Sequence, residues 1–285
     1  MSRSGGMKET GDSADVVDIV TKENLEYYLA GNTKWAGQNL FVCEETDSTN
    51  LQAKRLGETG APNGTLVIAD RQSAGRGRRG RGWDSPKRCN IYMSLLLRPD
   101  FVPDKASMLT LVMAYSVQKA IYSCTGLDTR IKWPNDIVFN GKKLVGILTE
   151  MSVGMNHICH VIIGVGINVN VEAFPGEIAD KATSLQIEAG TKIERNRLAA
   201  EVMKQFEQDY ESFVETGNLS WMKQAYNDRL VNHGREVVVH GEKEPYRALA
   251  LGINDMGELC VRLNDGREEA VFAGEVSVRG VYGYV

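Results

Sequence analysis

The 285-residue sequence contains little cysteine, and its five cysteines are odd in number and widely spaced, without a CxxC pair. These features exclude a disulfide framework and a zinc finger and are typical of a reducing compartment, so we expect a cytoplasmic protein. No apolar run reaches the roughly 18 residues of a membrane span, and the polar start MSRSGGMKETGDSAD lacks the apolar core of a secretory signal. We therefore expect residues 1–15 to be a disordered tail and the protein not to bind membranes.

Neither sign of charge dominates the chain. Its 33 Lys and Arg residues stand against 37 Asp and Glu residues, which gives a formal net charge of −4. Domains that bind nucleic acid usually carry a basic face, so this balance argues against RNA or DNA as the main ligand. The hydrophobic share of 42% is ordinary for a globular protein, and the length allows one large domain or two smaller ones.

The pattern of the sequence changes near residue 233. From there to the end, short β-rich runs separated by turn signals predict a small β-barrel or sandwich of about 50 residues. Before it, runs of strand and helix length alternate, and Asn140-Gly141 between apolar runs predicts a hairpin. We expect strands at 39–46, 65–70, 90–99 and 157–170, helices at 47–60, 106–124, 195–217 and 219–231, and a short strand with a helical turn within 16–31.

The segment RQSAGRGRRGRGWDSP (71–86) is unlike the rest of the chain. Glycine lets backbone N–H groups approach a ligand closely, and arginine offers a fork of donors suited to phosphate or carboxylate. We expect such a loop to be mobile when empty and to order over a polyanion. Gly75, Gly77 and Gly80 match G-x-G-x-x-G, but poor helix material follows, which excludes a dinucleotide fold. A solvated surface loop or a non-specific RNA-binding segment is the alternative on composition alone.

Two further segments place polar residues at strand ends. KWPND (132–136) puts Asn135 and Asp136 in a turn, where they could hold a base, a ribose or a metal, although the same residues favour a plain β-turn. GVGINVN (164–170) sets glycines beside a buried strand, which allows close approach of a ligand, and Asn168 can read an adenine edge. A β-bulge is the alternative for this second segment.

Five motifs follow one another along the chain: DSTN (47–50), QSAGRGRRGRGWDSP (72–86), KWPND (132–136), KKLVGILTE (142–150) and GVGINVN (164–170). In this order they resemble the biotin–protein ligase family, also called biotin–[acetyl-CoA-carboxylase] ligase. The resemblance runs from about residue 40 to the C-terminus. It implies an α+β fold, with a mixed-sheet catalytic domain of the biotin/lipoate ligase type over 16–232 and a small C-terminal SH3-like β-barrel over 233–285.

The resemblance implies an ATP-dependent ligase that acts in two steps. Biotin and Mg-ATP give biotinoyl-5′-AMP and pyrophosphate, and the biotinyl group then passes to one lysine of a biotin carboxyl carrier protein domain of a carboxylase. Biotin and ATP would be the substrates and Mg²⁺ the metal cofactor. The loop at 75–81 would close over the acyl-adenylate and keep water from this reactive anhydride. The assembly would be a monomer or a homodimer.

The motifs also assign roles to single residues by position. Lys143, Arg76 and Arg78 would be catalytic, with Lys143 stabilising charge between the biotin carboxylate and the α-phosphate. No residue set is expected to hold a metal by itself. The expected biotin contacts are Ser48, Thr49, Asn50, Gln72, Arg76, Gly77, Arg78 and Lys143. The expected nucleotide contacts are Gly75, Arg79, Arg81, Trp83, Lys132, Asn135, Asp136 and Asn168.

Two departures from the family pattern matter. Members that repress transcription carry an N-terminal DNA-binding domain of some 60 residues, whereas about 40 residues precede the motifs here, so we expect no DNA binding by this chain. Some relatives stack the adenine on a tryptophan after the GINVN-type motif, and no tryptophan occurs between 134 and 220. Lipoate–protein ligase, a non-catalytic biotin-responsive regulator and an RNA-binding protein are the competing functions.

Overall fold

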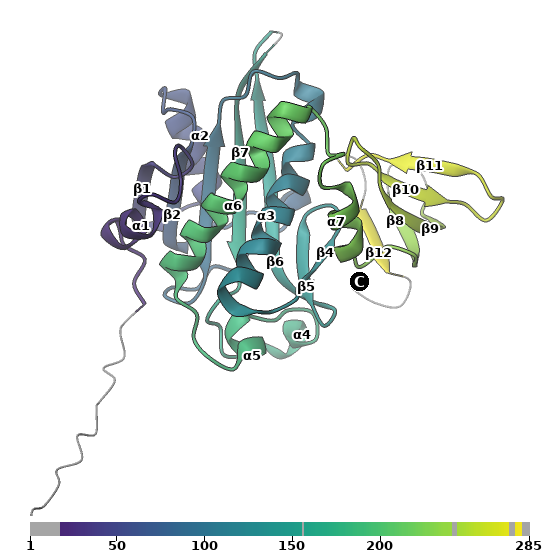
Figure 1. Ribbon diagram of the computed structural model, residues 1–285. Coiled ribbons are helices and arrows are strands. Elements are labelled where there is room, and N and C mark those ends of the chain that lie inside the picture. Colours follow the sequence, from purple (N-terminus) through teal and green to yellow (C-terminus); the bar gives the residue numbers. More distant parts are fainter. Residues whose placement is uncertain (1–17, 156, 241–243, 274–276, 281–285) are drawn as a thin grey trace, which may run out of the picture.

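A mixed sheet of seven strands and an antiparallel sheet of five strands organise the computed structural model, which describes residues 18–155, 157–240, 244–273 and 277–280 (Figure 1). In the larger sheet β1 and β2 are parallel, and every other neighbouring pair is antiparallel. Its spatial order is β1 (Asn39–Thr46), β2 (Thr65–Gln72), β3 (Ile91–Leu97), β7 (Ile158–Ile167), β6 (Lys142–Val153), β5 (Asp136–Phe139) and β4 (Arg130–Lys132).

Helices cover both faces of this sheet. On one face α3 packs against α6, and α1 packs against α6 in turn; α6 lies in front of the strands in Figure 1. On the opposite face α2 packs against β2, β3 and β7. The helix bounds are α1 (Lys22–Leu29), α2 (Thr49–Glu58), α3 (Met108–Thr125), α4 (Gly176–Ala179), α5 (Leu185–Ala189), α6 (Arg195–Thr216) and α7 (Lys223–Arg229), with 3₁₀ turns η1 (Arg78–Gly80) and η2 (Pro103–Lys105).

The inner strand β3 is buried along its whole length because both of its faces are covered. Leu95 and Leu97 belong to the main core under α3 and α6, whereas Leu96 belongs to a smaller cluster with Ala53 of α2. A strand that is buried on both faces has a continuous apolar sequence, which is why the sequence predicts β2 and β3 as strands. Since alternate residues share a face, Ser94 points to the α2 side together with Leu96. A polar group is thereby placed on the α2 face.

The C-terminal sheet stands beside α7 at the side of the molecule (Figure 1). All of its pairs are antiparallel. Together with the mixed sheet it confirms the expected α+β class. Its order is β11 (Glu268–Val271), β10 (Leu259–Arg262), β9 (Tyr246–Ile253), β8 (Glu236–His240) and β12 (Ser277–Gly280).

Most of the elements expected from the sequence are confirmed, and a few are not. The Asn140-Gly141 hairpin joins β5 to β6, with φ of 48° and 78° at the two residues. The tail expected at 1–15 lies outside the described residues. The strand expected before α1 is absent from residues 18–21, where the Thr21 hydroxyl instead caps the helix by accepting from the Asn24 N–H. The short helices α4 and α5 were not expected, because four or five residues are too few to show a helical period.

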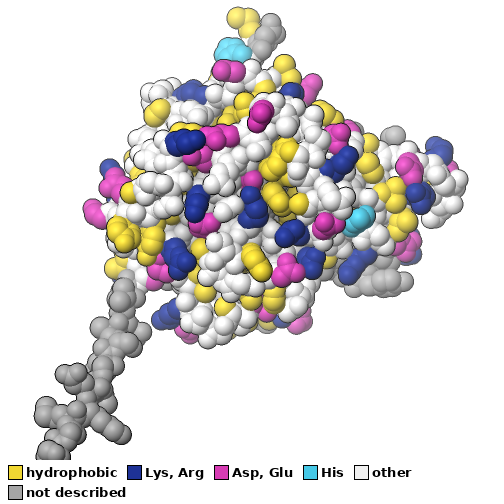
Figure 2. All heavy atoms as spheres, in the orientation of Figure 1, with side chains coloured by type: hydrophobic (Ala, Val, Ile, Leu, Met, Phe, Trp, Pro, Cys, Tyr) yellow, Lys and Arg dark blue, Asp and Glu magenta, His cyan; other side chains and the backbone are white. Residues whose placement is uncertain are grey.

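Surface charge agrees with the balanced composition. On the face that carries α3 and α6, basic and acidic side chains are interspersed (Figure 2). No helix within the described residues is both long enough and apolar enough to cross a membrane.

Candidate functional site

A hollow on the α2 face of the large sheet has a floor in which glycine replaces larger residues. Gly146 of β6 lies opposite Gly166 of β7. A Cβ at Gly146 or Gly166 would come 2.7 or 2.6 Å from the ring of Trp83, and one at Gly164 would lie 2.0 Å from Asn50 Oδ1. These strands therefore need glycine, because Trp83 and Asn50 lie directly on the sheet.

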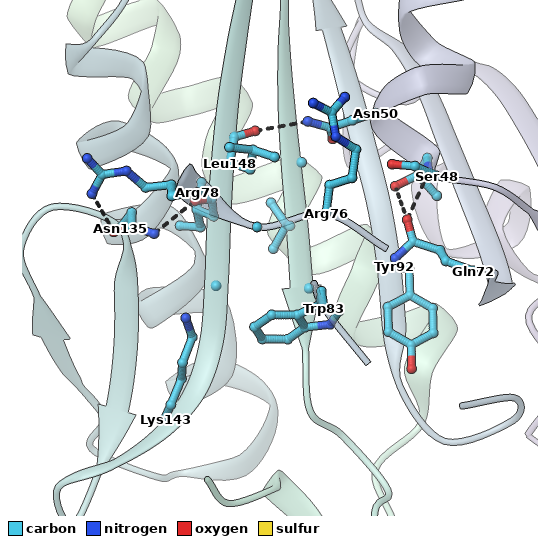
Figure 3. A pocket seen from close by; sticks show the side chains of 17 residues that line it. Ser48, Asn50, Gln72, Arg76, Arg78, Trp83, Tyr92, Asn135, Lys143 and Leu148 are labelled. Carbon is cyan, nitrogen blue, oxygen red and sulfur yellow. Dashed lines mark hydrogen bonds between the residues drawn. The ribbon is translucent and has the colours of Figure 1, made fainter. Parts of the chain in front are cut away.

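One end of the hollow is lined by neutral polar groups at the start of α2 (Figure 3). Gln72 Oε1 accepts from the Thr49 backbone N–H at 2.9 Å, and Gln72 Nε2 donates to Ser85 Oγ at 2.9 Å. An amide nitrogen carries two hydrogens, so Gln72 keeps one N–H for a ligand. Ser48 is buried at the N-cap of α2, and its side chain makes no capping hydrogen bond. Such groups suit a neutral polar ring.

Asn50 lies next to this group with its amide orientation set by acceptors. Its Nδ2 donates to the Leu148 carbonyl at 3.2 Å and to Glu150 Oε2 at 2.7 Å. Ser94 Oγ lies 2.6 Å from Asn50 Oδ1 and donates to it. With both N–H groups used, the amide can offer a ligand only the second lone pair of its oxygen.

Trp83 and Lys143 form the other end of the hollow (Figure 3). Lys143 Nζ lies 5.2 Å from the centre of the Trp83 ring and 2.7 Å from Asp136 Oδ1. The indole N–H is buried and has no hydrogen-bond partner among the described residues. An ammonium group over an aromatic face beside a carboxylate is a site where an incoming anion can replace the carboxylate.

The arginine-rich loop crosses the mouth of the hollow and is held by its own side chains. Arg76 Nη1 lies 3.3 Å from Glu150 Oε1. Arg78 donates to Asn135 Oδ1 at 3.0 Å and to the Ala273 carbonyl at 2.6 Å, which joins the loop to the C-terminal region. Burial lowers the pKa of Arg78 from its ordinary high value, but a guanidinium so modified remains charged at neutral pH. The loop thus places cations beside the hollow.

A larger, basic cavity of about 840 Å³ adjoins the hollow, whose own free volume is about 50 Å³. Its cations come from the loop, from β4 and β6, and from the turn after α4, and Asp136 and Asp180 lie among them. Among the described residues no three His, Cys, Asp or Glu side chains gather to hold a metal. Its basic residues are Arg78, Arg79, Arg81, Lys132, Lys143 and Lys181.

Comparison with known proteins identifies the family. The pattern of the Biotin/lipoate A/B protein ligase family matches residues 42–168, and that of the Biotin protein ligase C terminal domain matches residues 233–279. The bifunctional ligase/repressor BirA of Bacillus subtilis (strain 168) is 41% identical over 236 residues, which cover 82% of this chain and 72% of that protein. This chain belongs to the biotin protein ligase family.

Other members of the biotin protein ligase family agree in sequence and in fold. The biotin–[acetyl-CoA-carboxylase] ligase of Mycobacterium tuberculosis (strain ATCC 25618 / H37Rv) is 33% identical over 247 residues, covering 84% of this chain and 88% of that protein. The biotin protein ligase from Aquifex aeolicus in complex with biotin and ATP superposes with a TM-score of 0.74 at 32% identity, covering 85% of this chain and 99% of that one.

The structure brings together most of the residues that the sequence singled out. The hollow and the basic cavity account for all but two of them. Gly75 supports the loop instead, since a Cβ there would lie 2.4 Å from the Trp83 carbonyl oxygen. Asn168 is buried outside both linings, and its Nδ2 donates to the Thr183 carbonyl at 3.1 Å. The hollow is lined by Ser48, Thr49, Asn50, Gln72, Arg76, Gly77, Arg78, Trp83, Asn135 and Lys143, and the cavity adds Arg79, Arg81, Lys132 and Asp136.

Sequence reasoning missed Tyr92, Ser94 and the carboxylate of Glu150. Tyr92 lines the hollow, and its buried hydroxyl donates to the Pro86 carbonyl at 3.0 Å. Burial raises the pKa of Tyr92, so the phenol stays neutral and serves as a wall rather than a base. The serine inside the apolar run IYMSLLL was the available signal, because a polar residue within a buried strand needs a partner.

Proposed function

We propose that this chain is an ATP-dependent ligase that activates biotin as biotinoyl-5′-AMP and transfers it to a lysine of a biotin carboxyl carrier protein domain. One observation supports this proposal most strongly. The hollow, which is neutral and polar at one end, and the large basic cavity share Gly77, Arg78, Trp83, Asn135 and Lys143. A neutral ring with an acidic tail and a polyphosphate would therefore meet at Lys143. The cysteines of the chain are all free, which suits a reaction in the reducing cytoplasm.

The neutral end of the hollow suits the ureido ring of biotin. This ring has N–H donors and a carbonyl acceptor but no charge. Asn50 Oδ1 keeps one lone pair for an N–H, and Gln72 Nε2 keeps one hydrogen for a carbonyl. Lipoate carries an apolar disulfide ring, which would leave these buried groups unpaired, so the hollow favours biotin over lipoate. The small free volume implies that the loop or Trp83 moves when the ligand enters.

Adenylation would take place where the two spaces join. A carboxylate oxygen of biotin attacks the α-phosphorus of ATP, the bond to the bridging oxygen of the β-phosphate breaks, and pyrophosphate leaves with the electron pair. Lys143 Nζ, now 2.7 Å from Asp136, would turn to the developing negative charge on the α-phosphate. In the second step the amine of the acceptor lysine attacks the acyl carbon, loses a proton, and releases AMP.

Asp136 is suited to help hold Mg²⁺ during the first step. Its carboxylate lines the basic cavity, and a single carboxylate together with substrate phosphates is a common way to bind this ion. Bound Mg²⁺ would neutralise charge on the phosphates. The side chain of Asp136 is largely buried beside Lys143, so the pair would place a cation and a metal ligand at the same phosphate.

Removal of the Arg78 side chain is expected to release the adenylate faster. Arg78 links the loop to Asn135 and to the carbonyl of Ala273, and both contacts would be lost in Arg78→Ala. Loss of about 1.5–3 kcal/mol from hydrogen bonds to a charged group corresponds to roughly 10- to 150-fold faster dissociation. The measurement is the dissociation rate of biotinoyl-5′-AMP by stopped-flow chase. Arg71→Ala is the control, because Arg71 forms an exposed pair with Glu45; an unchanged rate in Arg78→Ala would contradict the proposed lid.

Mass spectrometry of a carrier domain incubated with this chain, biotin and Mg-ATP tests the proposed function. A mass gain of one biotinyl group is the expected result, with lipoate as the control substrate. Retained adenylate without transfer would favour a biotin-responsive regulator. Turnover with lipoate alone would mean that the substrate is lipoate and that the proposed substrate, biotin, is wrong. RNA binding with a steep dependence on salt and no turnover would restore the RNA-binding alternative.

A further inference from the structure

Glu150 lies behind the polar end of the hollow and contacts two of its walls without lining it. Its Oε2 accepts from Asn50 Nδ2 at 2.7 Å, and its Oε1 lies 3.3 Å from Arg76 Nη1. Glu150 follows Leu148 by two residues on β6, so both point to the α2 face. One carboxylate thereby joins the floor of the hollow to the loop that closes it.

The contact with Glu150 decides which way the Asn50 amide faces. A carboxylate and a backbone carbonyl are acceptors only, so the NH₂ group must point to Glu150 and Leu148. The oxygen then faces Ser94 and keeps its remaining lone pair for the hollow. If the amide were reversed, the same place would present an N–H group, which could not pair with an N–H of the ligand. Glu150, which lies outside the hollow, and the carbonyl of Leu148 therefore set the polarity of this wall together.

Glu150 also completes a chain of hydrogen bonds that begins and ends on the loop. From Arg76 the chain passes through Glu150, Asn50 and Ser94 to Thr49, whose hydroxyl lies 2.8 Å from Ser94 Oγ. The backbone N–H of Thr49 donates to Gln72 Oε1, and the chain continues through Gln72 Nε2 to Ser85, which donates to the Trp83 carbonyl. Both ends of the loop are thus connected to the side chains that would bind the ring of the ligand.

The Arg76–Glu150 pair is too exposed to serve mainly for stability. The two side chains are 46% and 37% exposed, and pairs of this kind contribute about 0–1 kcal/mol. The bond from Glu150 to Asn50, in contrast, is short and charge-assisted. Together the two contacts of Glu150 orient the Asn50 amide and the Arg76 side chain.

We propose that Glu150 is a positioning residue for biotin: it fixes the amide of Asn50 with its oxygen toward the ureido ring and docks Arg76 over the bound ligand. This inference rests on the proposed function and adds to it the residue that sets the polarity of the ring site. Glu150 acts through Asn50 and Arg76 and takes no part in the displacement at phosphorus.

The test is the steady-state kinetics of Glu150→Gln. Glutamine keeps the length of the side chain, but it loses the charge that holds Arg76, and its NH₂ group allows the Asn50 amide to reverse. We expect KM for biotin to rise about 10-fold, while KM for ATP and kcat at saturating biotin stay within about twofold. Glu150→Asp retains the charge and is expected to fall between the wild type and Glu150→Gln. Glu45→Gln, which removes the exposed partner of Arg71, is the matched control and should behave as the wild type.

Several outcomes would overturn the inference. A KM for biotin unchanged in Glu150→Gln would do so, as would equal rises for biotin and ATP, or a Glu150→Asp variant no better than Glu150→Gln. Thermal melting of each variant separates these outcomes from a loss of fold, because we expect a melting temperature close to that of the wild type. If the wild type itself transfers no biotin, the proposed function fails; if it transfers biotin and Glu150→Gln does so equally well, only the role of Glu150 fails.

Discussion

Replacement of Lys143 by methionine is expected to lower the rate of adenylation by about 10²- to 10³-fold, the usual effect of removing one preorganised donor to a developing charge. Lys143 belongs to both the hollow and the basic cavity, and its ammonium group is the cation that the proposed reaction places at the α-phosphate. Methionine keeps the aliphatic stem, so packing against Trp83 should survive. The Lys143 and Asp136 side chains are 26% and 13% exposed, so loss of this pair should lower the free energy of unfolding by about 1–3 kcal/mol.

Pyrophosphate release with biotin and ATP measures this effect. The matched control is Lys142→Met, because Lys142 is the preceding residue on β6 and its Nζ donates to the Ala179 carbonyl. We expect the control to keep the wild-type rate. A Lys143→Met variant that adenylates as fast as Lys142→Met would remove Lys143 from the proposed mechanism.

Replacement of Arg195 by methionine is expected to destabilise the fold by about 3–5 kcal/mol, the usual result when one partner of a buried charge network is removed. Arg195 is fully buried at the start of α6. Its Nε donates to Asp18 at 2.7 Å, and its Nη1 donates to Asp70 at 2.8 Å and to the Asn90 carbonyl at 3.0 Å. Without the guanidinium, Asp70 would keep a buried charge with no cation beside it.

Urea unfolding monitored by circular dichroism measures the change in free energy from the shift in midpoint at constant slope. Arg262→Met is the control, since Arg262 forms a half-exposed pair with Glu268 and should contribute no more than about 1 kcal/mol. An Arg195→Met loss as small as that of the control would mean that water or a rearranged side chain satisfies Asp70.

Local sequence signals predicted an element well where the pattern of residues within the element itself decides its structure. The helix α6 shows its three- and four-residue spacing because one face packs on the core, and the Asn140-Gly141 turn forms because both residues adopt positive φ. The prediction failed where the deciding partner is distant in the chain. The segment before α1 is held by contacts of Asp18 and Thr21 with residues near the start of α6 rather than by pairing as a strand.

The sequence predicted the residue types of the candidate site better than it predicted the contacts between them. Glycine and arginine in the loop indicated an anion site, and the five ordered motifs indicated the family. Nothing in the local pattern indicated that Asp136 holds Lys143, or that Arg78 reaches the Ala273 carbonyl across 195 positions. The nucleotide role of Asn168 remains a prediction, since its amide bonds to Thr183 in this structure.

The sequence by itself determined most elements of the fold, the chemistry of the loop and the membership of the family, because periodicity, turn residues and charge are properties of short segments. The tertiary structure alone decided that the two cavities share Lys143, and that Glu150 orients Asn50 from outside the hollow. The physical reason is the alignment of separate elements along β6, which brings Lys143 beside Asp136 of β5 and Glu150 beside Asn50 of α2. Such alignment depends on hydrogen bonds between distant segments, which no local pattern records.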